Sequence, residues 1–326
     1  MDIALNERAL RYLYTVARKG GVRAGADFLG VDPATVSRAV ARLEEEAGAV
    51  LLERHGRTVR PTEAGELLLE HFRSLRAQQE DTLNRLGELR NMERGTIDMA
   101  LGEGYIEDLH DGALSAFCHE YPGLVVNLHV AGSNEILRMI MEGDVHIGLI
   151  YNPPADPRIQ SCGGFVQPLC VMVGPAHPLG RSGAAVRLAD VLAYPIGLLQ
   201  GTYGVRQLVD MATAAAQLQL TPRLTSNSFG ALKEFACAGL GVTFMPAFAA
   251  RRAIAAGHLR AVVVDEPLFA KAEAHVIIRR GRRLSGSATR LVECMMRTMH
   301  AFGGDAIAHG LHASLPHTQR GALPER

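Results

Sequence analysis

Residues 20–62 read GGVRAGADFLGVDPATVSRAVARLEEEAGAVLLERHGRTVRPT. Two short helical patterns, at about residues 23–29 and 33–47, are joined by a tight turn, in which Asp32 is a good N-cap. An amphipathic stretch at residues 6–19 precedes them and ends at a glycine pair. Three short helices in this order predict a helix-turn-helix unit that enters a groove of double-stranded DNA.

The third helix is expected to have one buried and one exposed face. Its buried side chains are predicted to be Val36, Val40, Leu43 and Ala47. Its exposed face carries the candidate DNA contacts Ala34, Thr35, Ser37, Arg38 and Arg42. Short side chains near the helix start allow close approach to base edges, and the arginines can reach phosphates or guanine. The acidic run Glu44-Glu45-Glu46 is expected to turn the surface away from DNA.

A small wing is predicted after this helix, with strands at residues 51–54 and 58–60 around His55-Gly56-Arg57. Arg54 and Arg57 of the wing complete the set of expected DNA contacts. The formal net charge of the 326-residue chain is zero, so DNA binding has to rest on such a local basic patch. The plain alternative is a solvated helical hairpin with ordinary surface arginines.

Residues 62–91 predict one long helix, with Thr62 as its N-cap. Its apolar positions step by four and three residues, with two polar interruptions: Leu68, Phe72, Leu75, Gln79, Thr82, Leu86 and Leu89. Such a heptad seam favours pairing with a second copy of the chain, which would suit the reading of a two-fold DNA site. The alternative is an amphipathic helix packed on its own chain.

The segment VSRAVARLEEEAGAVLLERHGRTVRPTEAG, at residues 36–65, resembles the N-terminal signature of LysR-type transcriptional regulators. The matching positions are Ser37-Arg38, Leu43-Glu44, Gly48, Leu52-Glu53-Arg54 and Thr62-Glu63-Ala64-Gly65. The sequence departs from the pattern where Leu52 replaces a Phe and where Gly21 and Gly25 replace a Ser and an Ala. The two glycines are expected to loosen the second helix by about 1 kcal/mol each.

Beyond Gly95, short apolar runs alternate with helical patterns, which is typical of α/β layers. Strands are predicted at residues 96–101, 124–130 and 145–151, and helices at 112–119 and 133–141. A crossing to a second lobe is expected at residues 165–169. Similar patterns, including a strand at 196–199, continue to about residue 302. Their order resembles the effector domain of the same family, which is like a periplasmic binding protein.

The predicted fold is therefore an N-terminal all-α winged helix-turn-helix, a long linker helix and a two-lobed α/β effector domain like a periplasmic binding protein. The expected boundaries are 1–61 for the DNA-binding domain, 62–91 for the linker and dimerisation helix, and 92–302 for the effector-binding domain. Lobe I takes about residues 92–166 and 268–302, and lobe II about 167–267. The tail, 303–326, has no periodicity and is expected to be disordered.

A ligand cleft is expected between the lobes, where strand ends meet helix N-termini that offer N–H groups. The candidate effector-binding residues are Gly104, Tyr105, Ser133, Asn134, Gln200, Thr202, Tyr203, Ser226 and Asn227. The resemblance implies that the loops holding Ser133, Thr202 and Ser226 line effector pockets. The donors favour a small organic anion as co-inducer, while the alternative for each residue is a plain N-cap.

No catalytic set, resident cofactor or metal site is predicted. The Gly102-Glu103-Gly104 run lacks the third glycine of a dinucleotide fingerprint, and no nucleophile stands with a base. His309 and His312 could share a helix face, but Gly310 and Pro316 argue against a helix there. The chain lacks a signal peptide and an apolar run long enough to span a membrane, so a cytoplasmic protein is expected.

The sequence therefore favours a transcriptional regulator that binds an interrupted DNA palindrome as a dimer or tetramer and responds to a small molecule. RNA polymerase is an expected partner if the regulator is an activator. A cytoplasmic solute-binding or enzymatic α/β protein is the alternative. This alternative does not explain the cationic wing, and the sequence contains no catalytic set that would support an enzyme.

Overall fold

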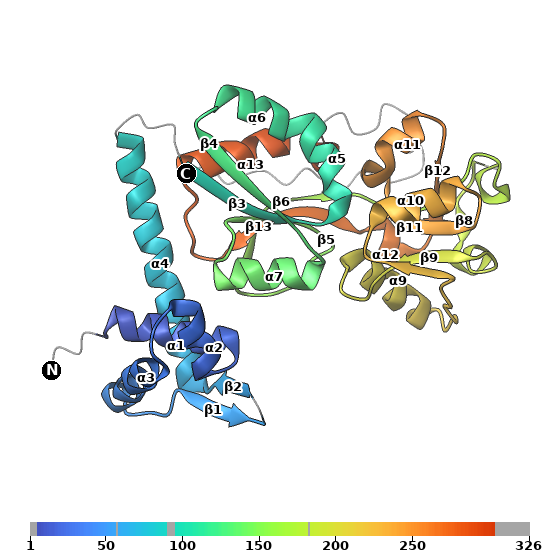
Figure 1. Ribbon diagram of the computed structural model, residues 1–326. Helices are drawn as coiled ribbons and strands as arrows, with labels where there is room; N and C mark the ends of the chain where they lie inside the picture. The colour runs from blue at the N-terminus through green and yellow to red at the C-terminus, as the bar shows by residue number, and fades with distance from the viewer. Residues whose placement is uncertain (1–4, 57, 90–94, 182, 304–326) are drawn as a thin grey trace. The chain divides into compact units, whose positions relative to one another are not determined.

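The structure is a computed structural model that describes residues 5–56, 58–89, 95–181 and 183–303 (Figure 1). Residues up to Asn91 make up most of one compact unit, and residues from Met92 onward make up most of a second. Arg57, the side chain of Leu89 and the histidines of the tail lie outside the described residues.

The first unit is a helical domain with a two-stranded hairpin. Its elements are α1 (Glu7–Lys19), α2 (Val22–Leu29), α3 (Pro33–Ala47), β1 (Leu52–His55), β2 (Thr58–Pro61) and α4 (Glu63–Leu89). Asp32 is the N-cap of α3, as predicted, and its Oδ1 accepts a hydrogen bond from the Ala34 amide at 2.8 Å. Gly48 ends α3 in the left-handed conformation, with a φ of 64°.

The core of this unit confirms the predicted buried face of α3, with one exception. Val36, Val40 and Leu43 are buried in a cluster with α1 and α4. Ala47 is exposed, so its predicted burial was wrong. It lies in the last turn, beyond the last residue of α3 that belongs to the cluster.

The helix α4 completes the core of its own unit with its first half. Leu69 and Phe72 are buried there, and the ring of Phe72 lies 5.4 Å from that of Tyr14 on α1. The other expected seam positions in this half, Leu68 and Leu75, pack against the same cluster. The first half of the seam therefore packs on its own chain, as in the alternative of an amphipathic helix that covers its own core.

The two unusual glycines near α2 have different roles. Gly21 precedes α2 as its N-cap, so the expected helix loosening does not apply there. Gly25 lies inside α2, and a Cβ added to it would come within 3.1 Å of Val16 Cγ2 on α1. A glycine at position 25 thus allows α1 and α2 to approach closely.

The second unit contains two sheets, each with helices around it (Figure 1). Lobe I has the strand order β4-β3-β5-β13-β6. Its strands are β3 (Gly95–Leu101), β4 (Leu124–Val130), β5 (Ile147–Tyr151), β6 (Ile159–Val166) and β13 (Glu273–Arg279). Its main helices are α5 (Ile106–Leu109), α6 (Ser115–Glu120), α7 (Ser133–Glu142) and α13 (Gly286–Thr298).

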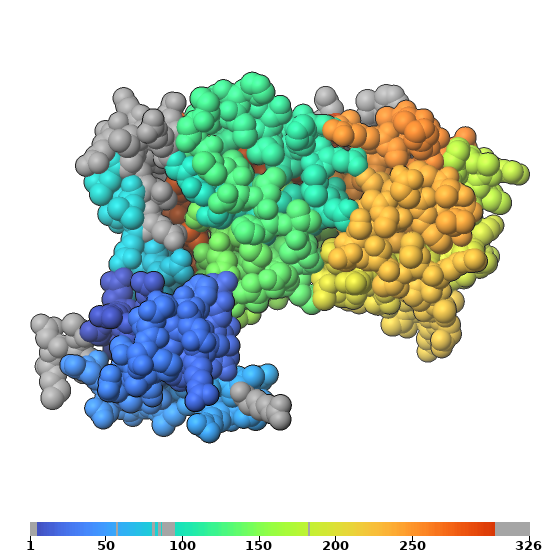
Figure 2. Space-filling model, viewed as in Figure 1, coloured from blue at the N-terminus to red at the C-terminus, as the bar shows by residue number. Residues whose placement is uncertain are grey.

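Lobe II has the strand order β10-β9-β11-β7-β12-β8. Its strands are β7 (Leu169–Val173), β8 (Val186–Arg187), β9 (Ile196–Leu199), β10 (Leu224–Ser226), β11 (Val242–Pro246) and β12 (Arg260–Asp265). Its helices are α8 (Leu188–Val191), α9 (Gly204–Ala215), α10 (Phe229–Cys237), α11 (Arg251–Ala255) and α12 (Pro267–Ala270). In Figure 2 the green surface of lobe I meets the yellow and orange surface of lobe II along a seam.

Two elements of lobe I differ from the sequence expectation. The helix predicted at residues 112–119 begins at Glu103, as a 3-10 turn followed by α5, a π-turn and α6. Gly112 lies in the π-turn, where a Cβ would come within 3.0 Å of the Thr298 carbonyl oxygen, so the glycine allows this stretch to approach α13 closely. Strand β6 was not predicted, since its Gly163-Gly164 pair reads as a loop.

The glycines of β6 allow close packing against side chains. A Cβ at Gly164 would come within 2.4 Å of the His275 ring, and one at Gly163 within 2.2 Å of the Met296 methyl group. Within the described residues, no helix is long and apolar enough to cross a membrane.

Gly65 explains one position of the sequence signature and gives a test of the packing between α4 and the wing. A Cβ at Gly65 would lie 2.1 Å from the Leu51 carbonyl oxygen, which accepts a hydrogen bond from the Thr62 amide. Gly65→Ala should lower the free energy of unfolding by about 1–3 kcal/mol, although Ala normally favours a helix. Urea denaturation of the full chain measures this.

Gly21→Ala is the control, because nothing lies within 4 Å of a Cβ added there. It should cost no more than about 1 kcal/mol, the loss of a favourable N-cap residue. A Gly65→Ala protein as stable as the Gly21→Ala protein would contradict the close approach of α4 to Leu51.

Candidate functional site

The exposed face of α3 carries the residues expected to contact DNA. Ala34, Ser37, Arg38 and Arg42 are exposed, and Thr35 is half-buried. The opposite face is held in the core, so the orientation of this polar face is fixed by packing.

A groove of about 320 Å³ lies between α3 and α1. Thr35, Arg38 and Arg42 line it from α3, at a spacing of three and four residues. Arg8 and Tyr12 line it from α1, where the Arg8 Nε donates a hydrogen bond to the Tyr12 hydroxyl at 2.8 Å. Sequence reasoning missed Arg8 as a cation beside the candidate surface, because Arg8 lies on a different helix, far from Arg38 in the chain.

The two arginines of α3 differ in their surroundings. The guanidinium of Arg42 donates a hydrogen bond to Glu46 at 2.9 Å, and the Arg42 side chain stays 80% exposed. Contact between Arg42 and a phosphate would have to break or share this ion pair. Arg38 is exposed one turn closer to the helix start, where helix-turn-helix proteins contact bases.

The wing is fixed to both α3 and the turn after α1. Glu44 Oε1 accepts a hydrogen bond from the Leu51 amide at 2.8 Å, which joins the last turns of α3 to the residue just before β1. The Val59 amide donates to the Gly20 carbonyl oxygen at 2.9 Å. Glu44 thus serves as an anchor for the wing. Arg54 is exposed on β1 and pairs with Val59 in the strand register.

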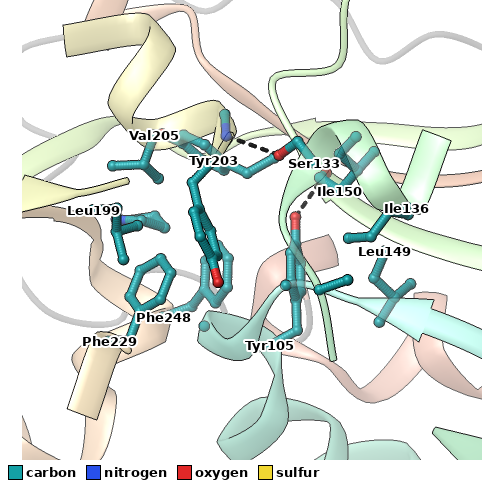
Figure 3. A pocket seen from close by; sticks show the side chains of 16 residues that line it. Tyr105, Ser133, Ile136, Leu149, Ile150, Leu199, Tyr203, Val205, Phe229 and Phe248 are labelled. Atoms are coloured by element: carbon teal, nitrogen blue, oxygen red, sulfur yellow. Dashed lines mark hydrogen bonds between the residues drawn. The ribbon is translucent and has the colours of Figure 1, made fainter. Parts of the chain in front are cut away.

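A second candidate site is a pocket between the two lobes of the second unit. It is lined by Gly102, Gly104, Tyr105, Ala131, Ser133, Ile136, Leu149, Ile150, Tyr151, Leu199, Tyr203, Gly204, Val205, Phe229, Pro246 and Phe248. Figure 3 shows Tyr203, Phe229 and Phe248 facing a space that Tyr105 borders from lobe I. The cavity is about 30 Å³, which is room for one or two water molecules and too small for a metabolite.

Four of the nine predicted effector residues line this pocket: Gly104, Tyr105, Ser133 and Tyr203. The other five are not part of its lining: Asn134 is the second residue of α7, Ser226 ends β10, and Gln200, Thr202 and Asn227 lie outside the helices and strands. Asn134 Oδ1 accepts a hydrogen bond from Gln207 Nε2 at 3.1 Å, and the Asn227 carbonyl oxygen accepts one from the Tyr203 hydroxyl at 2.9 Å. Sequence reasoning sought polar groups and therefore missed the apolar lining, such as Phe229 and Phe248.

The polar groups of the pocket already have partners within the protein. The Tyr105 hydroxyl donates to the Ile150 carbonyl oxygen at 2.8 Å. Burial, and to a lesser extent the Asp108 carboxylate, raise the pKa of Tyr105 well above its usual range, so this donor stays protonated. Burial, followed by the Glu103 carboxylate, likewise raises the pKa of Tyr203.

The start of α9 approaches lobe I very closely. The Gly204 amide donates a buried hydrogen bond to Ser133 Oγ at 2.8 Å, drawn as a dashed line in Figure 3. A Cβ at Gly204 would lie 2.3 Å from the Tyr151 carbonyl oxygen. Ser133 therefore does more than begin its own helix, because its hydroxyl takes up an N–H group of the other lobe.

The second interlobe contact involves Glu103, which the sequence did not single out for ligand binding. Its carboxylate reaches from the end of β3 to the first turn of α10, where it accepts hydrogen bonds from the Phe229 amide at 2.7 Å and the Gly230 amide at 3.2 Å. This contact joins residues about 126 positions apart and had no sequence signal. The described residues hold no group of three or more metal-ligating side chains.

Comparison with known proteins identifies both units. Residues 8–66 match the family model described as "Bacterial regulatory helix-turn-helix protein, lysR family", and residues 90–300 match that of the "LysR substrate binding domain". A curated relative, the HTH-type transcriptional regulator BbuR of Bordetella bronchiseptica, is 24% identical over 251 residues, which are 77% of each protein.

Solved structures show the same fold. A full-length OxyR variant from Pseudomonas aeruginosa matches with a TM-score of 0.63 and 18% identity, over 90% of this chain and 96% of that one. Full-length CbnR complexed with its target DNA matches with a TM-score of 0.52 and 23% identity, over 90% of this chain and 99% of that one.

The close approach at Gly204 gives a test of the interlobe geometry. Gly204→Ala places a methyl group against the Tyr151 carbonyl oxygen and should lower the free energy of unfolding by about 1–3 kcal/mol. A Cβ at Gly201, in the turn before α9, meets nothing within 4 Å, so Gly201→Ala should change stability by less than about 0.5 kcal/mol. Equal stabilities of the two variants in urea denaturation would show that α9 does not approach lobe I in this way.

Proposed function

The chain belongs to the LysR family of bacterial transcriptional regulators, and we propose that residues 1–61 read a two-fold DNA site while residues 92–302 sense a small molecule. As a member of this family it is a DNA-binding regulator with an effector-binding domain, and it is not an enzyme. This assignment sets aside the alternative of a solute-binding or enzymatic α/β protein. The cytoplasm is the compartment that we propose for it.

The observation that carries the DNA proposal is the polar face of α3, whose opposite face is buried in the core. We assign base contact to the short side chains Ala34 and Ser37 and to Arg38. Thr35 and Arg42 line the groove beside them and are assigned to the DNA backbone, together with the wing residues Arg54 and Arg57.

The oligomer that we propose is a dimer, or a tetramer built from dimers, that binds an interrupted palindrome. The first half of α4 is used by its own core, so a partner helix has to pair with the second half of residues 62–91. The exposed Leu83 and Leu86 of that half support this assignment. If the protein activates transcription, RNA polymerase is a further partner.

The effector site that we propose is the interlobe pocket, with Gly104, Tyr105, Ser133 and Tyr203 in its lining. Its small volume means that a ligand has to open the lobes or displace internal groups to enter. Asn134, Gln200, Thr202, Ser226 and Asn227 stay candidates for contact in such an opened form. An organic anion would meet fewer free backbone donors than the sequence suggested, because Ser133 accepts a hydrogen bond from the Gly204 amide and Glu103 accepts one from the Phe229 amide.

Arg38→Ala tests the DNA-reading assignment. Loss of a base contact should weaken binding to the preferred site by about 1–3 kcal/mol and reduce discrimination between related sequences. Arg54→Ala should instead weaken binding to all sequences alike and reduce the slope of log K against log salt by about 1, since a phosphate contact releases counterions. Fluorescence anisotropy with labelled duplexes at several salt concentrations measures both effects.

Arg187→Ala is the matched control, because this exposed arginine of lobe II pairs with Asp190, far from α3 in the chain. It should leave affinity and salt slope as in the wild-type protein. The assignment of α3 is wrong if Arg38→Ala binds DNA as the Arg187→Ala control does.

A further inference from the structure

The carboxylate of Glu103 occupies the start of α10 across the interlobe boundary. It accepts three hydrogen bonds, from the Ser228 hydroxyl at 2.9 Å, the Phe229 amide at 2.7 Å and the Gly230 amide at 3.2 Å. The three donors come from lobe II, whereas Glu103 follows β3 of lobe I. All of the contacts are partly buried, so water competes weakly for them.

Glu103 lies at the N-terminal end of α10, and the N-terminal end of a helix is a favourable place for an anion. The first N–H groups of a helix have no partner within the helix, and the helix dipole adds a partial positive charge there. An anionic ligand of the cleft would seek the same donors at Phe229 and Gly230. In this chain a side chain from the opposite lobe already supplies the carboxylate.

Two further acidic residues extend the contact between the lobes. Glu107 pairs with Lys233 on α10, and Asp111 pairs with Arg251 at 2.6 Å and with Arg252. Glu103, Glu107 and Asp111 are four residues apart, so they share one face of the helical stretch. Hydrogen bonding to Arg252 is the main cause that lowers the pKa of Asp111 below its usual value.

The pocket next to Glu103 has the lining of a site for an uncharged molecule. Of the described residues, those that line it include no Lys, Arg or His. Tyr105, Tyr203, Phe229 and Phe248 supply aromatic surface, and both tyrosine hydroxyls donate to backbone carbonyl oxygens. An anion in this pocket would lose water without gaining a cation from the lining, and the amides of Gly204, Phe229 and Gly230 are already paired within the protein.

We propose that Glu103 is a built-in carboxylate ligand of α10, placed where an anionic ligand of the cleft would otherwise bind, so that an organic anion has to displace it to reach these donors. The proposal rests on the proposed function only in placing the effector in this cleft.

The proposal can be tested by removing the Glu103 carboxylate and adding a free carboxylate, acetate, in its place. Glu103→Ala should lower the melting temperature of the full-length protein by about 4–8 °C, because charged hydrogen bonds are lost. Sodium acetate at 50 mM should recover at least half of this loss, relative to 50 mM sodium chloride, by binding in the vacated place. Acetamide should not, since it carries no charge. The wild-type protein should melt at the same temperature in acetate and in chloride.

Ser133→Ala is the matched control for loss of an interlobe hydrogen bond. It removes the acceptor of the Gly204 amide but vacates too little space for a carboxylate, so acetate should not raise its melting temperature. The proposal is overturned if acetate stabilises the wild-type protein as much as Glu103→Ala, or if it leaves Glu103→Ala unchanged.

If Glu103→Ala does not fold, Glu103→Gln tests the same contact between Glu103 and α10. The amide keeps the shape but turns one acceptor oxygen into a donor that faces the N–H groups of α10, so a loss of several degrees is expected. Glu120→Gln, whose carboxylate is exposed and bonded to Tyr121, should lose less than about 1 °C. Equal melting temperatures for these two variants would overturn the proposal. These measurements use neither DNA nor effector, so they can fail while the proposed regulatory function stands.

Discussion

A single carboxylate connects the two lobes of the effector-binding unit at a place where the backbone needs a partner. Glu103 satisfies the Phe229 and Gly230 amides of α10, and the Ser133 hydroxyl satisfies the Gly204 amide of α9. Each of these helices would otherwise begin with unpaired N–H groups beside an apolar pocket. These hydrogen bonds join the two lobes beside the small cavity between them.

In the DNA-binding unit, the buried face of each helix fixes which side chains lie on its exposed face. Val36, Val40 and Leu43 fix α3 in the core, so Ser37 and Arg38 face outward. Glu44 fixes the wing to the end of α3. The first half of α4 completes this core, so the long helix is a structural part of the unit as well as a candidate for dimerisation.

Local signals in the sequence were sufficient for much of this fold. Asp32 and Gly48 define the two ends of α3, and β4 and β9 are apolar runs whose bounds were predicted correctly. The sequence was misleading where glycine served packing, as in β6, whose Gly163-Gly164 pair makes room for Met296 and His275. It was also misleading for Ala47, since a periodic pattern does not show where a core ends.

The candidate pocket was predicted less well than the fold, for a physical reason. The helix starts at Gly204 and Phe229 can be predicted locally, but the group that accepts a hydrogen bond from each start comes from the other lobe. The organic-anion prediction followed from helix-start donors, and three of these, the amides of Gly204, Phe229 and Gly230, are paired with groups of the other lobe. Only the three-dimensional arrangement places Glu103 beside α10.

Amide hydrogen exchange at Phe229 and Gly230, in the full-length protein without effector, tests the central claim most directly. If Glu103 holds these two N–H groups, they should exchange as slowly as amides in the buried strands of lobe II, and exchange should rise at least tenfold when the carboxylate is removed. Exchange as fast as in the exposed loops of the wild-type protein would contradict a closed cleft held by Glu103.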